Sequence, residues 1–294
     1  MNYQHGFHAG NFADVVKHAV LARVLVHLRA KDKPFRVIDT HAGRGSYDLA
    51  SEEAKRTGEW RDGIGRIASG AGSEPPKLDP ALASFLAPYL EAVAAWRAER
   101  GPLAYPGSPA IIRHFLRPDD RLLAIEAQER SFAKLTRLFP AGARAKALNL
   151  DGYTAWNAYI PPRERRGLVF VDPPFEAPDE FARTAAALES AARKWPSGMT
   201  LIWYPVKDRD LVRNFTKRLE RLALPELWRV ELDTGAGADA AGLAACGLIL
   251  VNPPWTLPDE IAAALMPLAK LLARGARPSG SCRKIGVRLT SPRA

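Results

Sequence analysis

The chain has 294 residues, of which 47% are hydrophobic and 25% charged. This length allows two domains or one α/β domain with an insertion, and the composition is that of an ordinary globular protein. Fibres, small disulfide scaffolds and membrane bundles are excluded, since the longest apolar runs, such as 246–251, fall far short of the roughly 20 residues that span a bilayer. Because the first residues also lack a basic and then apolar signal, we expect a cytoplasmic protein with no membrane partner.

The charge balance favours a polyanionic partner. Lys and Arg number 42 against 32 Asp and Glu, which gives a net charge of +10. From position 270 onward, basic residues occur without any acidic one: Lys270, Arg274, Arg277, Arg283, Lys284, Arg288 and Arg293. Such a segment is typical of a nucleic-acid-binding surface and equally of a solvated, disordered tail, and charge alone does not separate the two. The two cysteines, Cys246 and Cys282, indicate neither a disulfide framework nor a thiolate metal site.

A helix and a short strand open the chain. Asn11 is a good N-cap, with Asp14 three residues on, for a helix whose apolar residues recur at helical spacing as far as Leu28. The apolar run 35–39 then predicts a buried strand, which leads directly into a glycine-rich turn at 40–45.

Six further apolar runs have the length of strands, and they lie at 122–126, 145–150, 168–172, 199–204, 227–232 and 247–252. Helical patterns separate most of them, at 131–138, 179–194 and 208–222. Alternating strands and helices imply an α/β fold with a seven-stranded, mostly parallel sheet and helices on both faces. A loop pattern at 233–238 joins the last two strands, so we expect these to pair as an antiparallel hairpin.

An irregular stretch interrupts the sheet pattern after the first strand. Its loop at 69–76 and its helical stripe at 79–100 predict a small helical subdomain inserted into the sheet domain. The expected organisation has four parts: arm, first helix and first strand (1–46), helical insertion (47–107), remainder of the sheet domain (108–270) and basic C-terminal tail (271–294).

The sharpest chemical signal is Asp172-Pro173-Pro174-Phe175, which follows a buried strand. Open α/β sheets bind ligands at the carboxyl ends of their strands. An exocyclic adenine amine is a poor nucleophile, because its lone pair is delocalised into the ring. If Asp172 and the carbonyl of Pro173 accept its two N–H groups, the lone pair is freed for an electrophile. The fixed φ of proline holds that carbonyl outward, and Phe175 offers a stacking face to a base taken out of its stack.

The same residues also have a purely structural interpretation. Two prolines can end a strand, and an Asp at this place can cap the following turn. A near-copy, Asn252-Pro253-Pro254-Trp255, follows the last predicted strand. We interpret this second motif as strand termination with the aromatic ring packed behind, rather than as the site.

Three other strand ends predict a nucleoside pocket together with Asp172. His41 lies in the glycine-rich turn, whose spacing lacks the dinucleotide-binding pattern. Glu126 ends the next strand, as required of a carboxylate that binds two ribose hydroxyls, and Asp151-Gly152 ends the strand after that. Singly, each is more often a turn or cap residue than a ligand, but four strand ends in order favour one pocket.

Other candidate residues have simpler alternatives. Ser108 followed by Pro109 is an ideal N-cap and first helical residue, which explains both without a ligand. Lys17 and His18, on the first helix, could be solvated or satisfied locally. We expect no metal, because carboxylate and cysteine partners at metal-like spacing are missing around the four candidate ligands His5, His8, His18 and His41.

Many short motifs in one order resemble a single family. They are Tyr3-x-His5-x-Phe7-His8-Ala9-Gly10-Asn11-x-Ala13-Asp14-Val15-x-Lys17-His18, Lys31-Asp32-Lys33-Pro34-Phe35, Asp39-Thr40-His41-Ala42-Gly43, Arg56-Thr57-Gly58-Glu59, Tyr105-Pro106-Gly107-Ser108-Pro109, Asp151-Gly152, Arg165-Arg166-Gly167-Leu168, Asp172-Pro173-Pro174-Phe175, Trp203-Tyr204-Pro205-Val206 and Asn252-Pro253-Pro254-Trp255. Together they are similar to the RlmJ family, whose members methylate N6 of one adenine in 23S ribosomal RNA with S-adenosylmethionine as donor. The resemblance implies the Rossmann-like class I methyltransferase fold with an inserted helical subdomain.

The resemblance also implies roles for individual residues. Contacts with S-adenosylmethionine fall on His18, His41, Ser108, Glu126, Asp151, Gly152 and Asp172. Tyr3 and Lys17 are expected near the RNA, and the chemistry falls on Asp172, Pro173 and Phe175. The chain departs from the family pattern at Phe175, where the usual Tyr would carry a hydroxyl, and beyond about Arg274, where no match continues.

The sequence therefore predicts a monomeric, S-adenosylmethionine-dependent methyltransferase for 23S ribosomal RNA. Two rival functions use the same features. A DNA adenine methyltransferase would use the same four-residue motif, and a non-catalytic RNA-binding factor would keep the basic surface around an inactive pocket.

Overall fold

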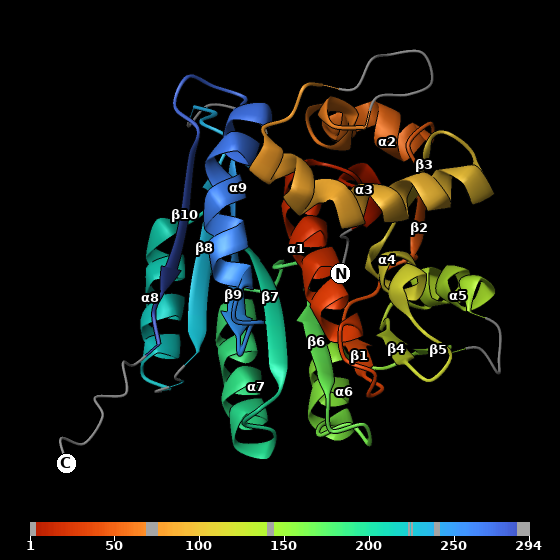
Figure 1. Ribbon diagram of the computed structural model, residues 1–294, viewed down its shortest axis with the longest axis vertical. Helices are drawn as coiled ribbons and strands as arrows, with labels where there is room; N and C mark the ends of the chain where they lie inside the picture. The colour runs from red at the N-terminus through yellow and green to blue at the C-terminus, as the bar shows by residue number, and fades with distance from the viewer. Residues whose placement is uncertain are drawn as a thin grey trace.

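The structure is a computed structural model that describes residues 4–68, 76–139, 144–222, 224, 226–237 and 242–286. Within these residues, ten strands form two sheets (Figure 1). Their bounds are β1 Arg36–Asp39, β2 Ser46–Asp48, β3 Ala104–Pro106, β4 Arg121–Ile125, β5 Ala145–Leu148, β6 Gly167–Val171, β7 Met199–Pro205, β8 Leu227–Asp233, β9 Ala245–Val251 and β10 Ser279–Lys284. The α-helices are α1 Phe12–Arg29, α2 Glu52–Thr57, α3 Pro80–Arg100, α4 Ser108–Phe115, α5 Glu129–Leu138, α6 Gly152–Tyr159, α7 Glu180–Lys194, α8 Arg209–Glu220 and α9 Leu257–Leu271.

The large sheet has the strand order β10-β8-β9-β7-β6-β1-β4-β5. The five strands from β7 to β5 are parallel, so their carboxyl ends share one edge. The chain passes from β1 to β4 on one side and later returns to place β6 on the other side of β1. This change of direction is the topological switch point at which open α/β sheets bind ligands. The predicted α/β class and the predicted hairpin of β8 and β9 are confirmed.

Two hydrophobic layers bury the two faces of this sheet. Successive strand residues point to opposite faces, so Val37 and Phe170 join one core cluster while Ile38 and Val169 join the other. The first cluster includes α1, α3, α4 and α9, and the second includes α6, α7 and α8. Figure 1 shows α1 and α9 on one face, with α3 crossing over them.

The first helix begins where its sequence predicts. Asn11 is the N-cap, and its side chain accepts the backbone N–H of Asp14. Almost every residue of α1 is buried, because the sheet lies on one side and α3 on another. This explains why charged residues inside α1 must find partners inside the protein.

The stretch between β1 and α4 contains α2, α3, two 3₁₀ helices (η2, Glu59–Asp62, and η3, Ile64–Arg66) and the strands β2 and β3. These two strands pair with each other and were not expected from the sequence. A third 3₁₀ helix, η1 (His5–Phe7), lies in the N-terminal arm and contacts α2.

In the part of the chain that the structure describes, the large sheet has eight strands, one more than predicted. Residues 279–284, expected as part of a basic tail, form β10 and pair antiparallel with β8. The strand was missed because the segment Ser279–Lys284 is polar and mostly exposed, as edge strands that resist aggregation often are. The end of the predicted tail, residues 287–294, lies outside the described residues.

The motif Asn252-Pro253-Pro254-Trp255 lies at the opposite edge of the sheet from the switch point. It follows β9, which runs antiparallel to β7, and so it emerges beside the first residues of β7. The expectation that the aromatic ring packs behind the strand is wrong, since Trp255 is 89% exposed. Asn252 fixes the turn with a positive φ and donates two side-chain hydrogen bonds, to the carbonyls of Pro196 and Gly198.

Gly167 permits the close pairing of β6 with β1. A Cβ at this position would overlap the carbonyl oxygen of Arg36, its neighbour in the register. We therefore expect Gly167→Ala to lower the free energy of unfolding by about 1–3 kcal/mol, because backbone must shift to make room. Chemical denaturation measures this loss. Gly237→Ala is the matched control, since no atom of the described residues lies within 4 Å of a Cβ at that position, and equal losses for both variants would contradict the steric explanation.

Candidate active site

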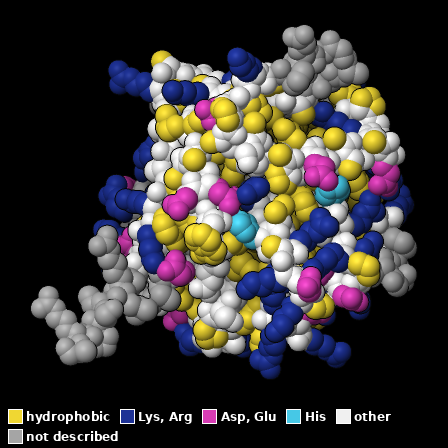
Figure 2. Space-filling view, in the orientation of Figure 1, with side chains coloured by type: hydrophobic (Ala, Val, Ile, Leu, Met, Phe, Trp, Pro, Cys, Tyr) yellow, Lys and Arg dark blue, Asp and Glu magenta, His cyan; other side chains and the backbone are white. Residues whose placement is uncertain are grey.

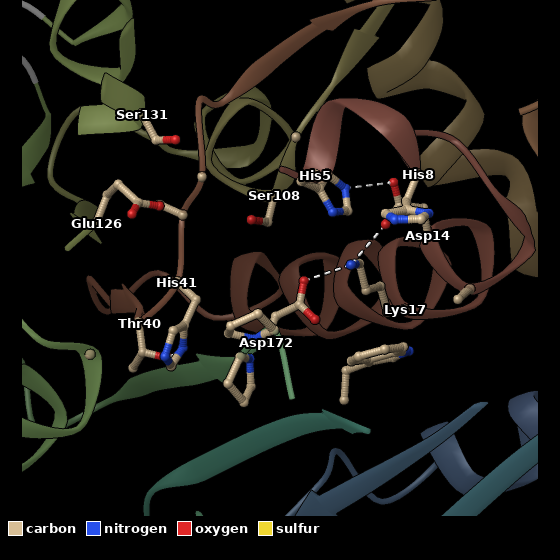
Figure 3. A pocket seen from close by; sticks show the side chains of 18 of the residues that line it. His5, His8, Asp14, Lys17, Thr40, His41, Ser108, Glu126, Ser131 and Asp172 are labelled. Carbon is tan, nitrogen blue, oxygen red and sulfur yellow. Dashed lines mark hydrogen bonds and ion pairs between the residues drawn. The ribbon is translucent and has the colours of Figure 1, made fainter. Parts of the chain in front are cut away.

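A cavity of about 380 Å³ opens at the carboxyl edge of the parallel strands (Figure 3). Its walls come from segments far apart in the sequence: the arm, α1, the turn after β1, the ends of β4, β6 and β7, the start of α6, and residue 59 of η2. The four strand ends that the sequence predicts to form a pocket all line this cavity, through His41, Glu126, Gly152 and Asp172.

One buried ammonium joins two carboxylates at the centre of this wall. Lys17 Nζ lies 2.6 Å from Asp172 Oδ2 and 2.7 Å from Asp14 Oδ1. The side chain of Lys17 is only 4% exposed, so the alternative of a solvated lysine is wrong. Figure 3 shows the three groups in a row along α1. The arrangement fixes Asp172, on the loop after β6, against the first helix.

The carboxylate of Asp14 is held at both oxygens. Oδ2 accepts hydrogen bonds from the backbone N–H of Gly10 (2.8 Å) and from Nε2 of His5 (3.0 Å). Burial opposes ionisation of Asp14, but the charges of His5 and Lys17 and the hydrogen bond from His5 hold its pKa well below the usual range. Asp14 therefore links the N-terminal arm to the Lys17 pair.

A second histidine ties the arm to the insertion. Nδ1 of His8 lies 3.0 Å from both carboxylate oxygens of Glu59, and the side-chain amide of Asn11 donates to Glu59 Oε2 at 2.9 Å. The pKa of Glu59 is lowered although burial opposes this, because His8 and Asn11 donate hydrogen bonds to it. Glu59 closes one side of the cavity.

Asp172, Pro173 and Pro174 line the cavity, whereas Phe175 lies outside its wall. Phe175 has a positive φ of 50°. Its ring packs against Phe181 (centroids 4.7 Å apart) and meets Trp203 edge-on (5.9 Å). Trp203, from β7, itself lines the cavity and lies with its ring 5.3 Å from Lys17 Nζ. Trp203 is therefore one of the aromatic rings of the wall, and Phe175 packs edge-on against it outside the lining.

Ser108 orients the end of β1. It is the first residue of α4, whose N-cap is Gly107, so the interpretation of Ser108 as the N-cap is wrong. Its hydroxyl instead donates to Asp39 Oδ2 at 2.7 Å. Burial raises the pKa of Asp39 to about 7, and the nearby charge of Asp172 adds to this, against the hydrogen bond from Ser108.

His41 is a neutral, half-buried ring at the turn after β1. Burial lowers its pKa to about 4. Its Nδ1 lies 2.8 Å from the Thr40 hydroxyl, and its ring meets Tyr153 edge-on at 5.5 Å. Gly152 leaves room for this packing, since a Cβ there would overlap the carbonyl of Thr40 and lie 2.9 Å from Nε2 of His41.

Glu126 and Asp151 both face the cavity and both have structural partners. Glu126 accepts the backbone N–H of Gln128 at 2.6 Å, and burial raises its pKa. Asp151 is the N-cap of α6, where Oδ1 accepts from the backbone and hydroxyl of Thr154, while Oδ2 pairs with Arg183 at 3.2 Å. The cap interpretation of Asp151 is thus confirmed, and it is compatible with a place in the cavity wall.

His18 is buried between the cavity and the insertion. Its Nδ1 lies 2.8 Å from the hydroxyl of Tyr105, and burial lowers its pKa to about 3, so the ring is neutral. It lines the cavity. The remaining predicted residue, Tyr3, lies outside the described residues.

Several wall residues had no assigned role in the sequence. Asp14 was considered for the helix start and lay within a motif without a role of its own, although a charged residue among apolar ones with Lys17 three positions on is a pattern of a buried pair. Trp203 and Glu59 lay within motifs but carried no separate signal. Tyr153, Glu180 and Arg183 form a hydrogen-bonded and charged group that only the packing of α6 on α7 brings together.

In the described part of the chain, no group of three or more His, Cys, Asp or Glu is arranged to hold a metal ion. Within those same residues, no helix has both the length and the apolar character to cross a membrane.

The parallel sheet, its switch point and a cavity walled by four strand ends define a class I methyltransferase fold. The comparisons agree. A protein of Legionella pneumophila, LPL1258, has a crystal structure that superposes with a TM-score of 0.83 and 32% sequence identity, over 94% of this chain and 98% of that chain.

The family follows from sequence comparison. Residues 32–284 match the family model described as Ribosomal RNA large subunit methyltransferase D, RlmJ. The Escherichia coli protein named Ribosomal RNA large subunit methyltransferase J is 35% identical over 261 residues, covering 89% of this chain and 90% of the relative. Its namesake from Haemophilus influenzae is 35% identical over 273 residues, covering 92% and 94%. The chain belongs to the RlmJ family of ribosomal RNA methyltransferases.

The raised pKa of Asp39 predicts a pH-dependent stability. Burial raises the pKa of Asp39 from 3.8 to about 7 on folding. Unfolding therefore releases a proton between these pH values, and the contribution of Asp39 to stability falls as pH rises through them. The side-chain amide in Asp39→Asn does not ionise, so this variant does not lose stability in this way. We expect the melting temperature of the variant minus that of the wild type to increase by several degrees from about pH 5 to about pH 8. A difference that does not vary with pH would contradict the assignment.

Proposed function

We propose that this protein transfers a methyl group from S-adenosylmethionine to N6 of an adenine in 23S ribosomal RNA. The observation that carries the proposal is the position of Asp172 and Pro173, at the carboxyl end of β6 in the wall of the cavity, with Asp172 anchored by Lys17. The ribosomal RNA named for the curated relatives supplies the substrate class.

Asp172 is placed to orient an amine. Oδ2 is engaged by Lys17, and no described residue donates a hydrogen bond to Oδ1. Oδ1 can therefore accept one N–H of an adenine amine, while the carbonyl of Pro173 accepts the other. Two acceptors at the amine concentrate its lone pair on nitrogen and turn it away from them, which is the orientation that attack requires.

Lys17 positions this carboxylate without needing to touch the base. Its ammonium is shared between Asp172 and Asp14, and both pairs are largely shielded from water. The Asp172 carboxylate is therefore already oriented before the reaction and does not have to move during it. Such preorganised charges are the main source of electrostatic stabilisation in enzymes.

The residues of the cavity fit S-adenosylmethionine. When bound, this donor supplies an electrophilic methyl group on a positively charged sulfur. Glu126 at the end of β4 presents the carboxylate that ribose hydroxyls require. Gly43, with a φ of +62°, lets the backbone pass along the wall where a Cβ would overlap the Tyr47 hydroxyl. The ring of His18 adds a neutral polar group.

The RNA side of the proposal rests on charge and on aromatic rings. The net charge of +10 favours a polyanion, and Figure 2 shows Lys and Arg side chains spread over the visible face. Trp203 at the wall and Phe175 behind it offer a platform for a base. Because ribosomal RNA is the substrate, the proposal places the protein in the cytoplasm.

Replacing Asp172 tests the mechanism. Asp172→Ala removes one of the two acceptors for the amine, so we expect methyl transfer to fall by at least about a hundredfold while donor binding is largely kept. Transfer of a labelled methyl group to RNA and calorimetric titration with the donor measure the two effects. Asp179→Ala is the matched control, because this exposed Asp makes no side-chain hydrogen bond at the start of α7. Retained turnover in Asp172→Ala would rule the mechanism out.

The choice of nucleic acid needs its own assay. The purified protein, with labelled donor, is offered 23S ribosomal RNA transcript and double-stranded DNA of the same sequence. We expect label in N6-methyladenosine of the RNA alone. Label in the DNA would favour the rival DNA methyltransferase, and binding of RNA with no label in either would favour the non-catalytic factor.

A further inference from the structure

Three buried rings form a hydrogen-bonded chain that runs from the insertion to the cavity. The hydroxyl of Tyr89, on α3, lies 3.0 Å from the hydroxyl of Tyr105, on β3, which lies 2.8 Å from Nδ1 of His18 on α1. Both tyrosines are fully buried, and His18 is 2% exposed. His18 lines the cavity, so this chain connects the insertion to whatever the cavity holds.

All three groups are neutral. Burial lowers the pKa of His18 to about 3 and raises the pKa of both tyrosines above the ordinary value. A neutral imidazole carries one proton, either on Nδ1 or on Nε2, and its two nitrogens then have opposite roles. The direction of the chain decides which nitrogen carries it.

Two directions are possible for the protons. If His18 donated from Nδ1 to Tyr105, only one of the two tyrosine hydroxyls could donate to the other, and the proton of the remaining buried hydroxyl would have no acceptor among the described residues. If Tyr89 donates to Tyr105 and Tyr105 donates to Nδ1 of His18, both buried hydroxyl protons are hydrogen-bonded. The one proton left over is then on Nε2 of His18, a residue that lines the cavity, where a ligand can accept it. A buried donor without an acceptor is costly. The second direction is therefore the stable one.

We propose that Tyr89 and Tyr105 are positioning residues that fix His18 with its proton on Nε2, as a hydrogen-bond donor to the cavity. In the part of the chain that the structure describes, Nδ1 is taken by Tyr105, and this is the one hydrogen bond found for the His18 ring. The Nε2–H of His18 therefore selects an acceptor oxygen of the bound ligand. In S-adenosylmethionine, the strongest hydrogen-bond acceptor is the carboxylate. The identity of the ligand rests on the proposed function, whereas the proton position does not.

Nitrogen-15 NMR tests the proton position directly. The chain has six histidines, and long-range nitrogen–proton spectra of the ¹⁵N-labelled, ligand-free protein give the tautomer of each, with the His18 ring assigned from its absence in His18→Asn. We expect an unprotonated, hydrogen-bonded Nδ1 and a protonated Nε2 in His18. The opposite tautomer, or an even mixture, would overturn the proposal.

Removing one hydroxyl at a time tests the tyrosines. Tyr89→Phe frees Tyr105 to turn its proton away, so we expect a mixture of His18 tautomers and about a threefold rise in the Kd of S-adenosylhomocysteine. Tyr105→Phe removes the donor itself, and we expect about a tenfold rise, the upper range for one hydrogen bond. Tyr159→Phe, on α6 and away from this chain, is the matched control. Circular dichroism and thermal unfolding confirm that the variants fold.

The outcomes separate this inference from the proposed function. An unchanged His18 spectrum in both Tyr89→Phe and Tyr105→Phe, or an unchanged Kd in Tyr105→Phe, would overturn the role of the tyrosines. A wild-type protein with the expected tautomer that fails to bind S-adenosylhomocysteine would instead overturn the cofactor assignment.

Discussion

The buried ammonium of Lys17 is the contact on which the rest of the active site depends. It joins a carboxylate from the sheet edge, Asp172, to one from the first helix, Asp14, and both distances are below 3 Å. Charges withdrawn from water are expensive unless each finds a partner. The two ion pairs of Lys17 therefore constrain α1, β6 and the N-terminal arm to one arrangement, because displacing any of these segments would leave a buried charge without its partner.

Around this contact the fold collects parts that are distant in the sequence. The parallel strands bring their carboxyl ends to one edge, and the switch of direction beside β1 leaves room there for a ligand. The insertion adds the remaining wall. It supplies Glu59, which holds the arm through His8, and the two tyrosines behind His18. Its position between β1 and α4 thus serves the cavity as well as the core.

The sequence predicted the parts of this arrangement that depend on local pattern. The seven apolar strands, the cap at Asn11 and the hairpin of β8 and β9 all follow from periodicity and turn chemistry, and the strand ends His41, Glu126 and Asp172 do meet. What it missed depends on tertiary packing. The partners of Lys17, the bond from Ser108 to Asp39 and the orientation of Phe175 are set by residues many positions away. The strand β10 has a polar sequence that pairs only because β8 presents an open edge.

The most direct test of the central claim is mass spectrometry of 23S ribosomal RNA from cells with and without this protein. The account predicts that one N6-methyladenosine disappears with the protein, returns when the wild-type chain is restored, and stays absent when the chain carries Asp172→Ala. An unchanged set of methylated adenosines, or full restoration by Asp172→Ala, would contradict it.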